Sequence, residues 1–129
     1  MKFRINTKLP SLNDYIDACR KNKYAGADFK RETENTILYY IYDSINKGEI
    51  KPVSGQCFVH FEWNERTKKR DADNIASAKK FILDALQKTV ILPNDGRKYI
   101  AGFTDRIIDS TENYVDVVIE EINNGDYTR

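Results

Sequence analysis

The stretch from Gln56 to Trp63 alternates between apolar and polar side chains, and this alternation limits the folds that the chain can adopt. Successive side chains of a strand point to opposite faces, so the pattern predicts a strand that buries one face. The apolar side chains of that face are Cys57, Val59, Phe61 and Trp63. Two segments with apolar residues at helical spacing, Asp28 to Lys47 and Ile75 to Lys88, can cover this face.

The rest of the chain adds shorter elements of both kinds. Strands are predicted from Lys2 to Thr7, from Tyr99 to Ile108 and from Tyr114 to Ile122, and a short helix from Ser11 to about Arg20. The connections are interpreted as a basic loop from Lys21 to Gly26, a hairpin turn from Asp109 to Asn113 between the last two strands, and a loose tail at 122–129. This order of elements predicts a single α+β domain with helices packed on a small mixed sheet.

The composition is that of a globular protein, with 40% hydrophobic and 32% charged residues. No apolar run approaches the roughly 18 residues that a membrane-spanning helix needs. No apolar stretch follows Met1 to Arg4, so a secretory signal is not expected. The two cysteines, Cys19 and Cys57, are too few for a four-ligand zinc site, and we expect two buried free thiols. These features favour a cytoplasmic protein without a membrane anchor.

Three carboxylates flank the predicted helix from Ile75 to Lys88. Asp71 and Asp73 precede it and are separated by one residue, whereas Asp95 lies in the turn that follows it. If the chain doubles back there, the three can converge, and a cation between them would offset their repulsion. Mg²⁺ takes oxygen ligands of this kind and suits phosphoryl chemistry. The alternative is that Asp71 or Asp73 caps the helix, which does not account for both together with Asp95.

Lys80 falls on the same helical stripe as Asp73, Ser77 and Asp84, so it can lie on the side of the carboxylates. The alternative is an exposed ion pair between Lys80 and Asp84, which would contribute little free energy.

A basic run directly precedes Asp71, although the net charge of the chain is only +1. Its members are Arg66, Lys68, Lys69 and Arg70. Such a run is either a solvated loop or a phosphate-binding surface, and its place beside the carboxylates supports the second interpretation. Lys21 and Lys23 could add further contacts, or could belong to an ordinary turn. His60, the only histidine, is interpreted as a structural residue of its strand.

These residues resemble the RusA family of Holliday junction resolvases. The matching segments are Asp71-Ala72-Asp73-Asn74, Lys80, Leu83-Asp84-Ala85-Leu86 and Asn94-Asp95. An N-terminal segment, Pro10-Ser11-Leu12-Asn13, is similar to the family's Pro-x-Ser-x-Asn opening. The resemblance covers roughly residues 2–122, and its specific part is residues 70–96.

The resemblance implies a RusA-like fold and a homodimeric endonuclease that resolves four-way DNA junctions by paired nicks in recombination and repair. Genes of this family are often carried by phages and prophages. The resemblance also implies that Asp71, Asp73 and Asp95 hold Mg²⁺, for which Mn²⁺ can substitute, and that Lys80 assists. The chain departs from the family at two points. Ser77 stands where well-known members have the lysine, and the acidic turn is Asn94-Asp95 instead of Asp-Asp.

Two other functions compete with a junction nuclease. A protein that grips branched DNA without cutting it is disfavoured by the carboxylate set, because unpaired carboxylates repel phosphate. A small-molecule phosphohydrolase is disfavoured because no nucleotide-binding glycine loop is present. For a homodimer, candidate interfaces are the helix around Tyr39 and Tyr42 and the strand from Gln56 to Trp63, and the sequence does not choose between them.

Overall fold

The computed structural model describes residues 1–122, and the expected loose tail from residue 123 on lies outside the described residues. In chain order the elements are β1 (Lys2–Ile5), α1 (Leu12–Lys21), α2 (Lys23–Asn46), β2 (Cys57–Glu65), α3 (Ala72–Ala76), α4 (Lys79–Lys88), β3 (Ile100–Asp109) and β4 (Tyr114–Glu121). Helices pack on a mixed four-stranded sheet, so the predicted α+β class is confirmed.

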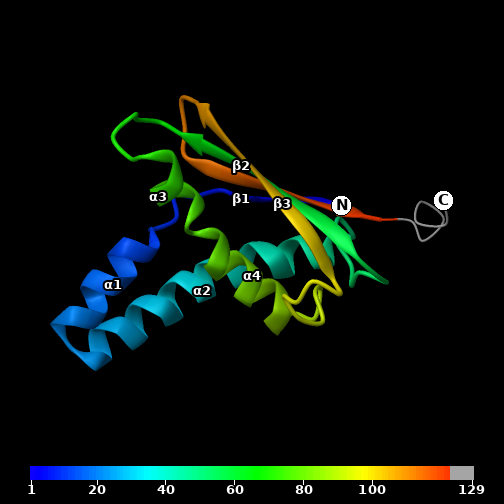
Figure 1. The fold of residues 1–129 in the computed structure, drawn as a ribbon, viewed down its shortest axis with the longest axis horizontal. Helices are drawn as coiled ribbons and strands as arrows, with labels where there is room; N and C mark the ends of the chain where they lie inside the picture. The colour runs from blue at the N-terminus through cyan, green and yellow to red at the C-terminus, as the bar shows by residue number, and fades with distance from the viewer. Residues whose placement is uncertain (123–129) are drawn as a thin grey trace.

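The strands lie in the order β1–β4–β2–β3, with β2 parallel to β3 and antiparallel to β4. A parallel pair needs a crossover, and here the segment that contains α3 and α4 provides it. Figure 1 shows the helices along one side of the sheet. The predicted face of β2 is buried against them, and Trp63 and Phe61 are among the largest fully buried side chains. β2 is therefore one of the two inner strands of the sheet, and its buried face forms part of the hydrophobic core.

The prediction that Asp109 to Asn113 form a hairpin turn between paired strands is wrong. β2 lies between β3 and β4, so this connection crosses the end of β2. Two hydrogen bonds hold it there: the Ser110 N–H donates to the Glu65 carbonyl at 2.9 Å, and the Arg66 N–H donates to Asn113 Oδ1 at 2.8 Å. An alternating pattern identifies strands but does not say which of them pair.

The prediction of a basic loop from Lys21 to Gly26 is also wrong. Only Asn22 separates α1 from α2, and its Oδ1 accepts the Ala25 N–H at 2.8 Å as the N-cap of α2. An asparagine cap can begin a helix at once because it satisfies a free N–H group of the first turn. α1 and the first half of α2 therefore form a helical hairpin that extends beyond the sheet (Figure 1).

The predicted continuous helix from Ile75 to Lys88 is divided into α3 and α4. At the division the bonds tighten to three-residue spacing, since the Lys80 N–H reaches the Ser77 carbonyl at 3.4 Å and the Phe81 N–H reaches the Ala78 carbonyl at 3.1 Å. The predicted apolar stripe is nevertheless buried as a whole. Its members are Ile75, Ala78, Ile82 and Leu86.

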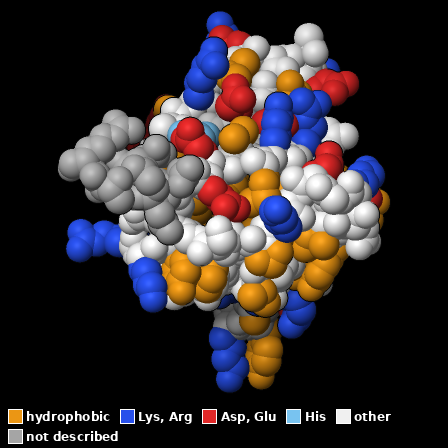
Figure 2. Space-filling view, turned by 90° about the vertical axis from the view of Figure 1, so that its right-hand side faces the viewer, with side chains coloured by type: hydrophobic (Ala, Val, Ile, Leu, Met, Phe, Trp, Pro, Cys, Tyr) orange, Lys and Arg blue, Asp and Glu red, His pale blue; other side chains and the backbone are white. Residues whose placement is uncertain are grey.

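The surface away from the Arg66–Arg70 run is of mixed charge. At that end of the molecule Lys, Arg, Asp and Glu side chains are interspersed with hydrophobic ones (Figure 2). None of the described helices has the length and apolar character needed to cross a bilayer.

Cys57 is buried as predicted, and burial raises the pKa of its thiol to about 11. Cys19 is exposed, contrary to the prediction, although its sulfur lies beside Gly26 of α2.

Candidate functional site

Asp71 and Asp73 line one cavity of about 410 Å³ between the start of α1 and α3. Asp71 is the N-cap residue of α3, but its carboxylate makes no capping hydrogen bond. Asp73 Oδ1 accepts the N–H of Asn74 at 2.9 Å. The Asp71 side chain therefore does not cap the helix. Within residues 1–122 the Asp71 carboxylate has no hydrogen bond or ion pair. Both aspartates are exposed, so a ligand in the cavity can reach them.

The other wall of the cavity comes from the beginning of α1. Ser11 and Asp14 form the predicted capping box, in which Ser11 Oγ accepts the Asp14 N–H at 3.1 Å and Asp14 Oδ2 accepts the Ser11 N–H at 2.8 Å. Asn13 Nδ2 then donates to Asn74 Oδ1 at 3.1 Å across the cavity. The N-terminal motif and the Asp71–Asn74 motif, which are distant in sequence, therefore build one site.

Ser77 also links the two walls of the cavity. Its hydroxyl donates to the Asn74 carbonyl at 2.6 Å and accepts the Leu12 N–H at 3.1 Å. Ser77 thus serves as a hydrogen-bonding link between the two walls of the cavity. The sequence did not single out this link, because the partner at Leu12 is a backbone group.

Asp95 lies with Lys80 and not with the Asp71–Asp73 cavity. Lys80 Nζ is 3.0 Å from Asp84 Oδ1 and 3.5 Å from Asp95 Oδ2. The hydrogen bond to Asp84 is the main cause of a raised Lys80 pKa, and the charge of Asp95 adds to it. Lys80 is therefore protonated at neutral pH, and it can act as a hydrogen-bond donor or a positive charge but not as a general base. The predicted alternative of a Lys80–Asp84 ion pair is present as well.

The donors of the cavity fit one hard cation. Mg²⁺ in proteins keeps several waters and takes one or two carboxylates, and Asp71 and Asp73 could supply these. In the part of the chain that the structure describes, no three Asp, Glu, His or Cys side chains are grouped so that they could hold one metal ion. The structure thus brings Asp71 and Asp73 together and places Asp95 on Lys80.

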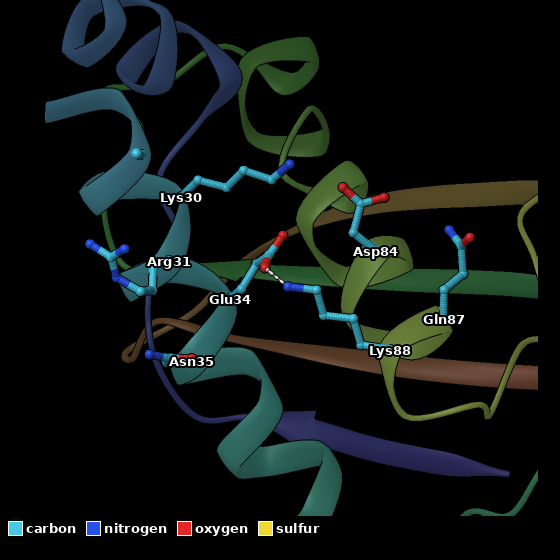
Figure 3. A pocket seen from close by; sticks show the side chains of 8 residues that line it. Lys30, Arg31, Glu34, Asn35, Asp84, Gln87 and Lys88 are labelled. Atoms are coloured by element: carbon cyan, nitrogen blue, oxygen red, sulfur yellow. Dashed lines mark hydrogen bonds and ion pairs between the residues drawn. The ribbon is translucent and has the colours of Figure 1, made fainter. Parts of the chain in front are cut away.

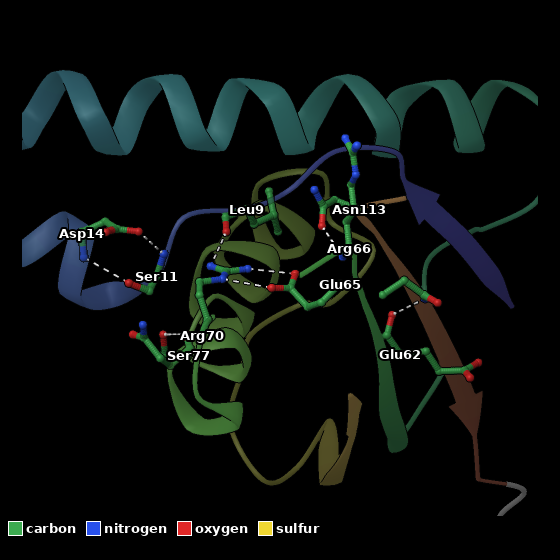
Figure 4. A network of polar contacts seen from close by, with 11 residues as sticks. Leu9, Ser11, Asp14, Glu62, Glu65, Arg66, Arg70, Ser77 and Asn113 are labelled. Atoms are coloured by element: carbon green, nitrogen blue, oxygen red, sulfur yellow. Dashed lines mark hydrogen bonds and ion pairs between the residues drawn. The ribbon is translucent and has the colours of Figure 1, made fainter. Parts of the chain in front are cut away.

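The basic run divides between the surface and the interior. Lys68 is 83% exposed and lies 3.5 Å from Asp109, and Lys69 is also exposed. Arg66 is exposed too, and Figure 4 shows its side chain extending away from the Glu65–Arg70 pair. Arg70 turns inward, where its guanidinium contacts Glu65 and the Leu9 carbonyl (Figure 4).

Lys21 and Lys23 lie at the far end of the helical hairpin. Both are exposed, and Lys23 Nζ is 5.2 Å from the centre of the Tyr24 ring. α1 has 10 residues, so its two ends are about 15 Å apart. These lysines therefore belong to a different part of the surface from the Asp71–Asp73 cavity.

A larger groove of about 670 Å³ lies between α2 and α4. Lys30 and Lys88 extend into it from the two helices, and Lys88 pairs with the buried Glu34 (Figure 3). Sequence reasoning missed this ion pair, because Glu34 lies in a polar stretch of α2 that carries no sign of burial. Its contact joins α2 to α4, which explains why a carboxylate is buried there.

His60 lies on the open face of the sheet, opposite the buried side chains of β2. Its Nδ1 is 2.7 Å from Thr104 Oγ1 and its Nε2 is 3.0 Å from Glu120 Oε1, so both ring nitrogens have partners on neighbouring strands. His60 is not among the residues that line the Asp71–Asp73 cavity.

We compared the sequence with models of protein families and with curated proteins. No model of a protein family matches the sequence, and no curated protein matches it.

Proposed function

We propose that this protein is a Mg²⁺-dependent, structure-specific endodeoxyribonuclease of the RusA type, which acts in the cytoplasm and resolves Holliday junctions by paired nicks. The observation that carries the proposal is the Asp71–Asp73 pair, whose carboxylates share one cavity. The Asp71 carboxylate has no hydrogen bond or ion pair within residues 1–122, so its charge is free to bind a ligand. A phosphodiester is repelled by two carboxylates unless a cation lies between them.

Asp71 and Asp73 are the proposed metal ligands, with Mn²⁺ as an alternative ion. Bound there, the metal would supply a Lewis acid that activates water and offsets the charge of the phosphate. Asp95 is proposed as the third ligand, which requires its carboxylate to leave Lys80. Lys80 would donate a hydrogen bond to the phosphate or to the attacking water, since its raised pKa keeps it charged.

DNA is proposed to bind through its phosphates. Arg66, Lys68 and Lys69 follow the end of β2 and directly precede the Asp71–Asp73 cavity in the chain. Contacts of this kind fix the register of the duplex without reading its sequence. Lys21 and Lys23, about 15 Å from the start of α1, would contact a second segment of a branched substrate.

The test is cleavage of a synthetic four-way junction with and without Mg²⁺. Asp71→Asn, Asp73→Asn and Asp95→Asn should each lower cleavage by about 100-fold or more, the scale on which loss of one charge-stabilising group acts. Junction binding should be retained or tightened, because each change removes a negative charge near phosphate. Asp43→Asn is the matched control and should cleave normally. It removes an exposed carboxylate from the C-terminal half of α2.

The outcomes separate the competing functions. Metal-dependent paired nicks that disappear with Asp71→Asn support the proposal. Tight junction binding without cleavage at any divalent metal would favour a binding protein. Hydrolysis of small phosphate esters without DNA cleavage would favour a phosphohydrolase. Full cleavage by Asp95→Asn alone would remove Asp95 from the ligand set and leave the other two aspartates in place.

A further inference from the structure

Arg70 belongs to the basic run in sequence but not in structure. Its side chain is 16% exposed, whereas that of Lys68 in the same run is 83% exposed. Arg70 Nε and Nη2 donate to the two carboxylate oxygens of Glu65 at 3.1 and 3.0 Å. This is a bidentate pair, the geometry that the guanidinium fork favours. The charge of Arg70 is thus neutralised inside the protein.

Glu65 is placed to receive this arginine. It is the last residue of β2, and its side chain is 7% exposed. Its backbone carbonyl accepts the Ser110 N–H, so the connection between β3 and β4 fixes its position from the other side. The pair therefore closes the short loop from Arg66 to Lys69 onto a rigid strand end.

A third donor of Arg70 extends the connection to the N-terminal segment. Arg70 Nη1 donates to the Leu9 carbonyl at 3.0 Å (Figure 4). Leu9 precedes Ser11, the cap of α1, and Arg70 directly precedes Asp71. The Arg70 guanidinium thus links the two walls of the Asp71–Asp73 cavity. The hydrogen bonds of Asn13 to Asn74 and of Ser77 to Leu12 link the same walls a second and a third time.

We propose that the Glu65–Arg70 pair positions Asp71 and the start of α3 against the start of α1. In this role Arg70 acts from inside the protein and does not contact DNA phosphate. The proposal rests on the proposed function for its catalytic consequence. Its structural part, the fastening of residues 71–77 to residues 9–13, stands independently. Partners that orient ligating carboxylates commonly change metal affinity or activity by about 10- to 100-fold when they are removed.

Three single variants distinguish a positioning role from a phosphate contact. Glu65→Gln breaks the charged pair and leaves every residue that could bind phosphate unchanged. Arg70→Lys keeps the positive charge but cannot form the bidentate contact. Lys68→Ala removes a positive charge from the exposed part of the same loop and is the matched control.

The first measurement is amide hydrogen exchange of the full chain without DNA. Glu65→Gln and Arg70→Lys should each lose protection in residues 9–13 and 71–77, while the protection of β2 is retained. Lys68→Ala should match the unaltered protein. Unchanged protection in both Glu65→Gln and Arg70→Lys would overturn the proposal. This outcome is independent of catalysis, so it differs from a failure of the proposed function, which would show as an unaltered chain that cuts no junction.

The second measurement pairs Mn²⁺ affinity with junction affinity over a range of salt concentrations. Glu65→Gln and Arg70→Lys should weaken Mn²⁺ binding and cleavage by about tenfold or more and leave the salt dependence of junction binding unchanged. Lys68→Ala should weaken junction binding and reduce the salt slope by about one, with Mn²⁺ binding unchanged. A fourth variant, Arg70→Ala, removes the positive charge as well as the bidentate contact. The proposal is overturned if Arg70→Ala reduces the salt slope as Lys68→Ala does while Glu65→Gln binds Mn²⁺ normally.

Discussion

Val90 has a backbone φ of +61°, and it is the only non-glycine residue with a positive φ in the described part of the chain. It follows the last turn of α4, where the Leu92 N–H closes back onto the Leu86 carbonyl at 3.1 Å. This is the left-handed position that glycine commonly occupies after a helix. A β-branched side chain there is strained, because its Cβ lies close to the backbone.

Replacing Val90 by Gly should therefore stabilise the protein. The left-handed conformation costs an L-residue about 1–2 kcal/mol, and the extra freedom of glycine in the unfolded chain offsets about 0.4–1 kcal/mol of that relief. The Val90 side chain is 61% exposed, so little buried area is lost. We expect the free energy of unfolding in urea to rise by about 0.5–1 kcal/mol. Val90→Ala, which keeps a Cβ, should bring no such gain, and an equal gain in both variants would show that strain at Cβ is not the cause.

Much of the residue pattern could be predicted from sequence. The buried face of β2 and the apolar stripe of α3 and α4 follow from period alone, and the Ser11–Asp14 capping box follows from local spacing. The burial of Arg70 could not be predicted in this way. It depends on Glu65 and on a backbone carbonyl at Leu9, and neither contact leaves a periodic signal.

At the level of the elements, the contact between α1 and α2 depends on one small residue. Gly26 is buried in the first turns of α2, and a Cβ built there would lie 2.6 Å from Cys19 Sγ and 3.1 Å from Cys19 Cα. The sulfur would have to move away from such a Cβ, and the approach to Cys19 Cα is tight enough that the backbone of α1 would also have to give way slightly. The helical hairpin that carries one wall of the site is thus set by this close approach.

Gly26→Ala should destabilise the protein although alanine favours a helix. Alanine gains about 1 kcal/mol of helix propensity over glycine, and overpacking costs about 1–3 kcal/mol. We expect a net loss of unfolding free energy, and Cys19→Ala in the same chain should recover part of it because the sulfur is the nearest atom. Thermal unfolding of the two single variants and the double variant measures this coupling. A gain in stability for Gly26→Ala alone would contradict the argument.

The order of strands and the ends of helices show where sequence reasoning stops. Strand positions were predicted closely, but the predicted pairing of β3 with β4 is wrong, because β2 lies between them and the crossover that contains α3 and α4 joins β2 to β3. The helix break at Ser77 was missed for a related reason. Ser77 bends the chain by bonding Leu12, which is far away in sequence.

Over the whole molecule, the candidate site consists of residues that are neighbours in sequence, Asp71 and Asp73, and of one that is distant in sequence, Asp95. Asp71 and Asp73 were predicted to lie together, and they do, because one residue separates them at a helix start. Asp95 was grouped with them on the condition that the chain doubles back. The segment between α4 and β3 does bring Asp95 to the first turns of α4, where Lys80 binds it. Its final position depends on loop conformation, which composition does not determine.

Under the proposed function, the symmetry of a four-way junction has a consequence for the assembly of the protein. Paired nicks require two matched sites, and this chain supplies one Asp71–Asp73 cavity. A two-fold dimer would place two such sites on opposite strands. Of the predicted interfaces, β2 is bonded on both edges and can contribute only its open face, where Phe58 is 37% exposed. Tyr39 and Tyr42 on α2 are 68% and 52% exposed and are not needed by the core.

We therefore expect a homodimer that uses the Tyr39–Tyr42 surface of α2. Light scattering at micromolar concentration should give about twice the chain mass, and the double change Tyr39→Ser and Tyr42→Ser should give a folded monomer, because both side chains are largely exposed in the single chain. On a plasmid that extrudes a cruciform, the unaltered protein should linearise the DNA, whereas the monomer should release mainly nicked circles, since its two cuts become independent events. Phe58→Ser is the matched control on the sheet face. If the monomer linearised the plasmid as fast as the unaltered protein, the argument from junction symmetry would be wrong.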